Sequence, residues 1–265
     1  MSKLFVFDID GTLVNRTYEL KKEIIESINT LLSKGYFVAT CSGRSFIGSM
    51  RFLSQFQEGN KFAICANGAL IYKVENKELL DRKPLKFKDY KKVYKFTSNV
   101  ENFFTYFYFG DDLFHMNYDE CIELDKASNN TNSYNVDNSF KDDTLIDKVM
   151  VRDKTREFMK SYKVPWSLKI NYQTVKSSKV FLEITNKKAK KGNAVERLRK
   201  SLNIKKSDVY VFGDSGNDVS MIKRFKNSVA MGNGIDKVKK YARYTTLSVD
   251  ECGVAHALRN ILKVI

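Results

Sequence analysis

The first third of the chain alternates short apolar runs with helical patterns. Leu4–Phe7 is a continuous apolar run, and apolar residues from Leu20 to Leu32 then recur at helical spacing before Gly35. Two further apolar runs follow, separated by a second predicted helix; the three segments are 36–41, 45–57 and 62–66. Because apolar runs that alternate with helices are typical of parallel strands buried on both faces, the pattern predicts an α/β fold with a doubly wound parallel sheet.

The character of the chain changes between about residues 83 and 187. Val180, Leu182 and Ile184 alternate with other residues, which predicts strands with one face toward solvent. The Asn-rich stretch 127–140 predicts a surface loop. The α/β rhythm resumes afterwards, with a helix from Gly192, strands at 209–212 and 228–231, and helices after 216, at 235–242 and after 253.

This interruption predicts a two-domain organisation. We expect a discontinuous core domain, residues 1–82 and 188–265, that is split by an inserted α+β domain, residues 83–187. Pro84 and the lysine-rich "TNKKAKK" stretch lie near the two crossings and are the candidate linkers.

The charge of the chain bears on its partners. With 46 Lys and Arg against 31 Asp and Glu, the formal net charge is +15, a sign that suits nucleic acid, an acidic membrane surface or an anionic metabolite. The lysines are spread in twos and threes along the whole chain, without a basic tail or an arginine-rich helix. This distribution favours a lysine-rich solvated surface, so no nucleic-acid partner is expected.

Two further features bear on location. The longest run without charge, 62–72, is far shorter than the roughly 20 residues that span a membrane. The first residues run directly into an apolar strand without the pattern of a secretory leader, so we expect a cytoplasmic protein with no membrane partner. The four cysteines are scattered without a CxxC pair, which disfavours a zinc site or a disulfide framework.

Polar residues that could take part in catalysis or ligand binding gather in four loops. They are "DIDGT" at 8–12, "SGR" at 42–44, "KKG" at 190–192 and "GDSGND" at 213–218. Three of these loops follow predicted strands and one opens a predicted helix. Because ligands of an open parallel sheet bind beyond the carboxyl ends of the strands, the loops predict one shared site.

The residue types in these loops indicate a phosphate chemistry. Asp8 and Asp10 alone could equally form a turn, but two neighbouring carboxylates require a cation, a shared proton or water. Asp214 and Asp218 add carboxylates from a second strand, which suits Mg²⁺; zinc or iron would call for histidine or cysteine. Ser42, Gly43 and Lys191 supply the hydroxyl, backbone N–H and ammonium groups that bind an anion, and the helix start at Lys191 is expected to place the ammonium at the same rim of the sheet.

In this order and spacing, the four loops resemble the four motifs of the haloacid dehalogenase superfamily of phosphohydrolases. The insertion, followed by "GDSGNDVSMI" and "VAMGNGIDKVKKYA", is similar to its Cof-type sugar-phosphatase branch. The resemblance extends over the whole chain and implies a Rossmann-like core with the inserted domain as a substrate-specificity cap.

The resemblance also implies a role for each matching residue. Asp8 would be the nucleophile that forms an aspartyl-phosphate, and Asp10 the general acid and base. Mg²⁺ would be held by the Asp8 and Asp214 side chains and the Asp10 backbone carbonyl, and Asp218 would orient metal-bound water. The remaining implied contacts are with phosphate, for Ser42, Gly43, Lys191 and Asn217, and with substrate, for Arg44 and Glu183.

Some alternatives stay open. Lys190 could replace Lys191, and Glu183 is more simply interpreted as a solvent-exposed strand carboxylate. The predicted activity is hydrolysis of a small phosphorylated metabolite, most plausibly a sugar phosphate. A phosphotransferase or phosphomutase would use the same intermediate, and a basic nucleic-acid-binding protein is the non-enzymatic alternative. The sequence leaves the substrate, the specificity residues of the cap and the oligomeric state undetermined.

Overall fold

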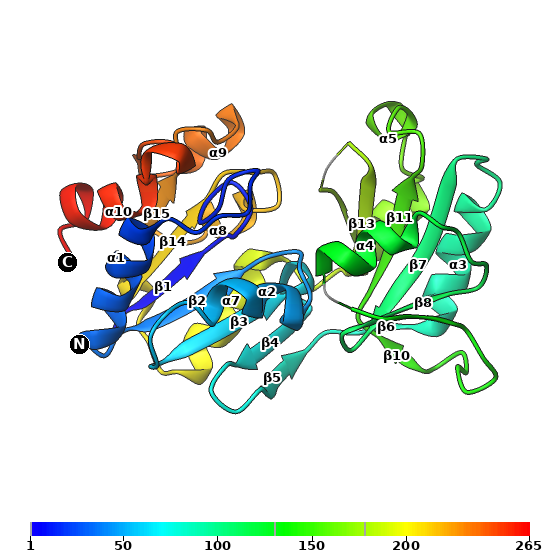
Figure 1. Cartoon of the computed structure of the whole chain (residues 1–265), viewed down its shortest axis with the longest axis horizontal. Helices are drawn as coiled ribbons and strands as arrows, with labels where there is room; N and C mark the ends of the chain where they lie inside the picture. Colours follow the sequence, from blue (N-terminus) through cyan, green and yellow to red (C-terminus); the bar gives the residue numbers. More distant parts are fainter. Residues whose placement is uncertain (1, 130, 178) are drawn as a thin grey trace.

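A computed structural model describes residues 2–129, 131–177 and 179–265. Its strands form two large sheets that lie side by side, with the chain crossing between them twice (Figure 1). The two crossings are adjacent, because the Asn186 side-chain amide donates a hydrogen bond to the Pro84 carbonyl over 2.8 Å. The predicted boundaries at 82/83 and 187/188 stay a prediction.

The first sheet is mainly parallel. Its strands, in spatial order, are β16 (Tyr244–Thr245), β15 (Asn227–Ala230), β14 (Val209–Gly213), β1 (Leu4–Phe7), β2 (Phe37–Cys41), β3 (Lys61–Cys65), β4 (Leu70–Lys73) and β5 (Glu78–Arg82). The pairs from β16 to β3 are parallel, and β4 and β5 add antiparallel pairs at one edge. The predicted parallel α/β sheet is therefore confirmed.

Helices cover both faces of this sheet. Along β1, Phe5 and Phe7 join the cluster on one face and Leu4 and Val6 the cluster on the other, and all four are fully buried. One face packs against α1 (Lys22–Ser33), α2 (Phe46–Leu53) and α10 (Gly253–His256), which is followed by a turn of π-helix over Ala257–Ile261. The other face packs against α7 (Lys191–Ser201), α8 (Val219–Ile222) and α9 (Asp236–Tyr241).

The second sheet is mostly antiparallel. Its strands, in spatial order, are β12 (Tyr172–Lys176), β13 (Phe181–Asn186), β11 (Lys148–Asp153), β7 (Phe103–Phe109), β8 (Asp112–His115) and β9 (Ser133–Asn135). A small pair, β6 (Leu85–Lys86) with β10 (Leu145–Ile146), lies beside it. The helices of this region are α3 (Phe87–Thr97), α4 (Ile122–Asn129), α5 (Phe158–Ser161) and α6 (Trp166–Asn171). The predicted α+β insertion is thus present.

Both faces of the second sheet are covered, in contrast to the predicted wet face. One face packs against α3, with Tyr90 and Val93 fully buried. On the other, Tyr106, Tyr108 and Met150 form a second cluster with Ile122 of α4. Helix α4 lies on the side of this sheet that is toward the first sheet (Figure 1). The strand alternation in β13 therefore separates two buried faces.

Two local predictions were wrong. The predicted helix 45–57 ends at Leu53, because the chain turns at Ser54 and Phe56 packs into the core from that turn. The predicted loop 127–140 contains the end of α4 and strand β9, which pairs with β8; residue 130 lies outside the described residues.

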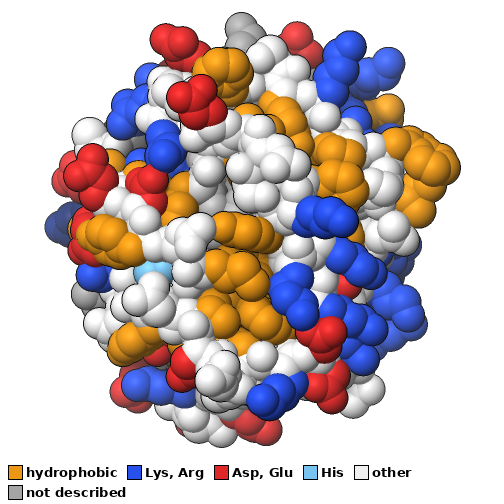
Figure 2. Space-filling view, turned by 90° about the vertical axis from the view of Figure 1, so that its right-hand side faces the viewer, with side chains coloured by type: hydrophobic (Ala, Val, Ile, Leu, Met, Phe, Trp, Pro, Cys, Tyr) orange, Lys and Arg blue, Asp and Glu red, His pale blue; other side chains and the backbone are white. Residues whose placement is uncertain are grey.

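The end of the molecule formed by the inserted region, where α3 covers the second sheet, exposes both hydrophobic and basic side chains (Figure 2). Figure 2 shows hydrophobic side chains in the middle of this face and Lys and Arg side chains gathered toward one side of it.

Within the part of the chain that the structure describes, no helix has the length and apolar character required to cross a membrane.

Candidate active site

The turn after β1 separates the two aspartates that the sequence pairs. Asp8 continues β1, since its N–H donates to the Phe212 carbonyl of β14 over 3.1 Å, and its side chain is buried. Asp10 lies beyond the strand with its side chain 46% exposed. Gly11 makes the turn possible: its φ is +87°, and a Cβ there would lie 2.5 Å from Asp214 Oδ2.

Three of the predicted carboxylates converge in one cluster. Asp8 at the end of β1 meets Asp214 and Asp218 from the loop after β14, with one oxygen of each residue within 4.8 Å of the others. The Asp10 carboxylate instead pairs with Arg44, whose Nε and Nη2 donate to its two oxygens over 2.9 and 2.5 Å. The structure therefore gives the two aspartates of the first loop different surroundings.

Lys191 is the positive charge of this cluster. Its ammonium donates to Asp8 Oδ1 over 2.6 Å and to Asp218 Oδ1 over 2.7 Å, and the side chain is fully buried. Lys191 is the first residue of α7, and the structure brings its ammonium to the same edge of the sheet as the loops that carry Asp8 and Asp218, where it is buried. The alternative residue, Lys190, is exposed.

Burial and mutual repulsion perturb these groups. Burial, together with the Asp218 carboxylate, raises the pKa of Asp8 well above its usual range, although Lys191 opposes the shift. The same causes raise the pKa of Asp214 to about 7. Burial lowers the pKa of Lys191, but Asp218 and Asp8 outweigh it and raise that pKa well above its ordinary value. Such a cluster has more negative charge than one lysine neutralises.

The donor set of the cluster suits a hard divalent cation. Asp8 and Asp214 offer carboxylate oxygens, the ligand type that Mg²⁺ prefers. Asp218 is already engaged: Lys191 donates to its Oδ1, and the N–H groups of Asp214 and Ser215 donate to its Oδ2 over 3.0 and 2.9 Å. These contacts fit Asp218 as a residue that shapes the loop and Asp8 with Asp214 as the side-chain ligands.

The "SGR" loop follows β2 and lies beside the cluster. Ser42 is buried, and its Oγ accepts a hydrogen bond from the Arg44 N–H over 3.2 Å, which leaves the hydroxyl proton available for an anion. Gly43 lies against Glu183 of the second sheet, because a Cβ at Gly43 would be 3.0 Å from Glu183 Oε1. Glu183 is 6% exposed, so its interpretation as a solvent-exposed carboxylate was wrong.

Asn217 reaches the same region through Asn67. Its side-chain amide donates to Asn67 Oδ1 over 3.0 Å, and Ser215 Oγ donates to Asn217 Oδ1 over 2.5 Å. Asn67 follows β3 in the left-handed backbone region, with a φ of 54°, a conformation that asparagine tolerates. Asn67 lies outside the four loops that the sequence singled out; its place directly after a predicted strand of the same sheet was the available signal.

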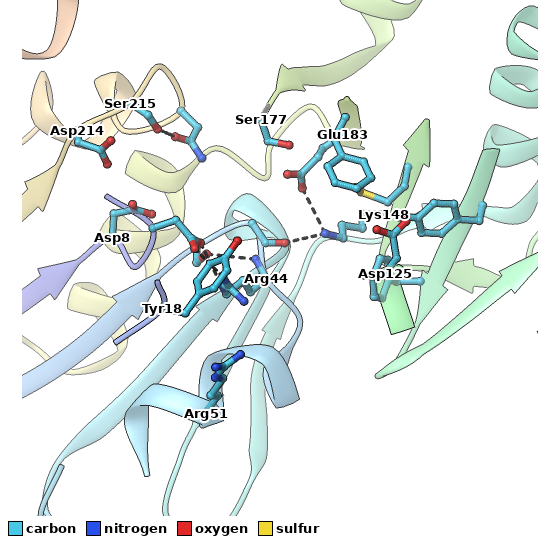
Figure 3. A pocket seen from close by; sticks show the side chains of 18 residues that line it. Asp8, Tyr18, Arg44, Arg51, Asp125, Lys148, Ser177, Glu183, Asp214 and Ser215 are labelled. Atoms are coloured by element: carbon cyan, nitrogen blue, oxygen red, sulfur yellow. Dashed lines mark hydrogen bonds and ion pairs between the residues drawn. The ribbon is translucent and has the colours of Figure 1, made fainter. Parts of the chain in front are cut away.

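A cavity of about 460 Å³ lies between the two sheets, next to Asp8 and Asp214 (Figure 3). From the first sheet it is lined by the predicted residues Asp8, Asp10, Ser42, Gly43, Arg44, Asp214 and Asn217, together with Tyr18, Arg51 and Ser215. The second wall of the cavity comes from the inserted region, which contains the second sheet. It is formed by Tyr106, Tyr108, Asp125, Lys148, Met150, Ser177, Phe181 and Glu183. Apart from Glu183, the residues of this second wall were not predicted.

Comparisons with known proteins agree with this geometry. Residues 5–258 match the family of haloacid dehalogenase-like hydrolases. The protein YxeH of Bacillus subtilis is 30% identical over 99% of both chains. A 5-amino-6-(5-phospho-D-ribitylamino)uracil phosphatase, YwtE of the same organism, is 25% identical over 98% of both. The crystal structure of a haloacid dehalogenase-like hydrolase from Bacteroides thetaiotaomicron is similar with a TM-score of 0.83 and 26% identity, covering 98% of this chain and 100% of that one.

Proposed function

Because the chain belongs to the haloacid dehalogenase-like hydrolases, an enzyme family of phosphatases, we propose that it is a Mg²⁺-dependent phosphatase acting through an aspartyl-phosphate on Asp8. The observation that carries this proposal is the buried cluster of Asp8, Asp214 and Asp218 around Lys191, open to a cavity between the sheets. The expected substrate is a small phosphorylated metabolite of the sugar-phosphate class.

Asp8 is the nucleophile in this proposal. Its carboxylate oxygen forms a bond to phosphorus while the bond between phosphorus and the leaving oxygen breaks. Lys191 orients the attacking carboxylate by holding Oδ1. Mg²⁺, when bound by Asp8 and Asp214, neutralises charge on the transferring group and keeps the nucleophile ionised. The Ser42 hydroxyl and the Gly43 N–H would bind the phosphoryl oxygens.

Asp10 is the proposed general acid and base. Its proton would go to the leaving oxygen in the first step, and in the second it would accept the proton of the water that attacks phosphorus. The pair with Arg44 bears on this role, because the guanidinium now occupies both Asp10 oxygens. We therefore expect substrate to displace at least one of these contacts.

The second wall of the cavity supports a small polar leaving group. Tyr106, Tyr108 and Phe181 provide ring surfaces, and the Asp125 carboxylate provides hydrogen-bond acceptors. This combination suits a polyhydroxylated molecule, and the name of YwtE describes a phosphorylated ribityl compound as the substrate of that relative.

Hydrolysis of p-nitrophenyl phosphate, with and without Mg²⁺, tests the proposal. We expect activity that requires Mg²⁺ and that Asp8→Asn abolishes, falling by at least about 10³-fold. Full activity of Asp8→Asn would show that another group attacks phosphorus. A panel of sugar phosphates, nucleotides, flavin mononucleotide and pyridoxal phosphate would then define the leaving group. Released phosphate would distinguish hydrolysis from an isomerised sugar phosphate, the product of a phosphomutase.

A further inference from the structure

We propose that Lys148 and Glu183, both on the second sheet, are positioning residues that hold the phosphate-binding loops of the first sheet in their working arrangement. The inference rests on the proposed phosphatase function. It assigns to the inserted region a task beyond contact with the leaving group.

Lys148 reaches across the cavity from the start of β11. Its ammonium donates to the Gly43 carbonyl over 2.7 Å and to Glu183 Oε2 over 3.3 Å, and it lies 4.5 Å from the centre of the Tyr108 ring (Figure 3). Tyr108 is its direct partner in the pairing of β11 with β7. The side chain is 5% exposed. Since an ammonium has three donors, these contacts leave little capacity for binding substrate.

The contact with Gly43 orients the Ser42 hydroxyl. The Gly43 carbonyl and the Arg44 N–H belong to one planar trans peptide, so they point in opposite directions. With the carbonyl held by Lys148, the N–H at the other end donates to Ser42 Oγ over 3.2 Å. Lys148 thereby helps to set the direction of the hydroxyl that is proposed to bind phosphate.

Glu183 acts on the second loop through two amides. Its Oε2 accepts from the Asn67 side-chain amide over 3.0 Å, and Asn67 Oδ1 in turn accepts from the Asn217 amide over 3.0 Å. Asn217 lies within the 213–218 loop that carries two of the clustered carboxylates. A continuous series of hydrogen bonds therefore links the second sheet to that loop.

The first sheet is shaped to receive this pair. A Cβ at Gly43 would lie 3.0 and 3.1 Å from the two Glu183 carboxylate oxygens and 3.3 Å from the Asn67 amide nitrogen. Asn67 is fully buried, and its N–H donates to the Ser42 carbonyl over 2.9 Å. The loops that follow β2 and β3 are thus joined to each other next to the Glu183 carboxylate.

The double variant Lys148→Met with Glu183→Gln removes the ion pair without leaving a buried charge unpaired. Glu183→Gln alone removes only the carboxylate charge: Lys148 keeps its contact with the Gly43 carbonyl, and the glutamine carbonyl can still accept from Asn67. Lys154→Met with Asp119→Asn is the matched control, since it removes another ion pair of the same region, 3.0 Å long and more exposed.

Three readouts separate positioning from substrate contact. With p-nitrophenyl phosphate and Mg²⁺, we expect the double variant to lower kcat by about 10- to 100-fold, because misplacement of aligned groups carries a cost of that size. The inhibition constant of inorganic phosphate should rise, and amide hydrogen exchange should accelerate at 42–44 and 66–68. Glu183→Gln should show a smaller change of the same kind, and the control pair none.

The opposite pattern overturns the proposal. If only KM for a sugar phosphate rises, with aryl phosphate turnover and phosphate inhibition unchanged, the pair contacts the leaving group. If the wild-type protein releases no phosphate, the proposed function is wrong. Hydrogen exchange then decides alone, and unchanged exchange in a folded variant also overturns the positioning role.

Discussion

Two buried lysines have different partners for their charge. One lies in the half that contains the first sheet, and the other lies in the half that contains the second sheet. Lys191 of the first half is fully buried between the carboxylates of Asp8 and Asp218. Lys148 of the second is 5% exposed and has one carboxylate, one backbone carbonyl and the face of a tyrosine ring. Lys191 thus belongs to a cluster with surplus negative charge, whereas Lys148 joins neutral backbone to a single acid.

The different partners of the two lysines indicate which property of the site each one is expected to affect. Lys191 touches the proposed nucleophile directly, so its removal should change the charge at the reacting atoms. Lys148 contacts the Gly43 carbonyl and the Glu183 carboxylate and does not touch the proposed nucleophile, so its removal should act through geometry. Replacing each lysine and comparing the effects on stability and turnover tests this division.

The largest effect is expected for Lys191→Met. Loss of the ammonium leaves Asp8 and Asp218 buried without a cation, which should destabilise the metal-free protein by about 3–5 kcal/mol. Activity should fall by about 10²- to 10³-fold, more than in any Lys148 variant, because charge at the transferring group is lost. Urea unfolding and p-nitrophenyl phosphate turnover measure the two effects.

The exposed Lys22, whose side chain is 86% exposed, provides the control Lys22→Met. It should leave stability and turnover unchanged. If Lys148→Met lowers turnover as much as Lys191→Met, the division between charge and geometry is wrong.

A smaller effect is expected from pH in the carboxylate cluster that contains Lys191. In the metal-free protein the pKa of Asp214 is raised from 3.8 to about 7 by burial and by Asp218. Between about pH 4 and 7 the folded state therefore binds more protons than the unfolded state, so stability falls as pH rises through this range and stays low above it. The expected size is on the order of 2 kcal/mol, allowing for solvent screening.

Thermal unfolding at pH 5.5 and pH 8 in a chelator measures this dependence. Asp214→Asn should reduce it, because the variant side chain does not titrate. Saturating Mg²⁺ at pH 8 should raise the melting temperature, since the cation offsets the repulsion. Equal melting temperatures at the two pH values for the metal-free wild type would contradict the surplus charge assigned to this cluster.

The two lysines also differ in how far the sequence could predict their surroundings. Asp8, Ser42, Lys191 and Asp214 lie in short loops at strand or helix ends, where residue type and neighbouring glycines form a local pattern. A parallel sheet then brings its strand ends together, so their convergence followed from the predicted fold. Their assigned roles stay predictions, as do the domain boundaries.

The second wall of the cavity had no such local pattern. Lys148 and Tyr108 lie on strand faces, forty residues apart, and only the register of β11 against β7 makes them neighbours. Glu183 was expected to face solvent because strand alternation indicates which residues share a face, not what covers that face. Here the cover is the first sheet's loops, a contact that periodicity in β13 could not specify.

The smallest expected effect concerns the contact between Lys148 and the Tyr108 ring. If the Tyr108 ring takes the place of a second carboxylate, Tyr108→Leu should destabilise the protein by about 1–2 kcal/mol beyond the loss of packing, because a buried cation then loses its π partner. Tyr108→Phe keeps the ring and should retain most of the stability. In a Lys148→Met background the specific part of the Tyr108→Leu effect should disappear. A double-mutant cycle in urea measures this coupling, and equal costs in both backgrounds would show that the ring contributes packing alone.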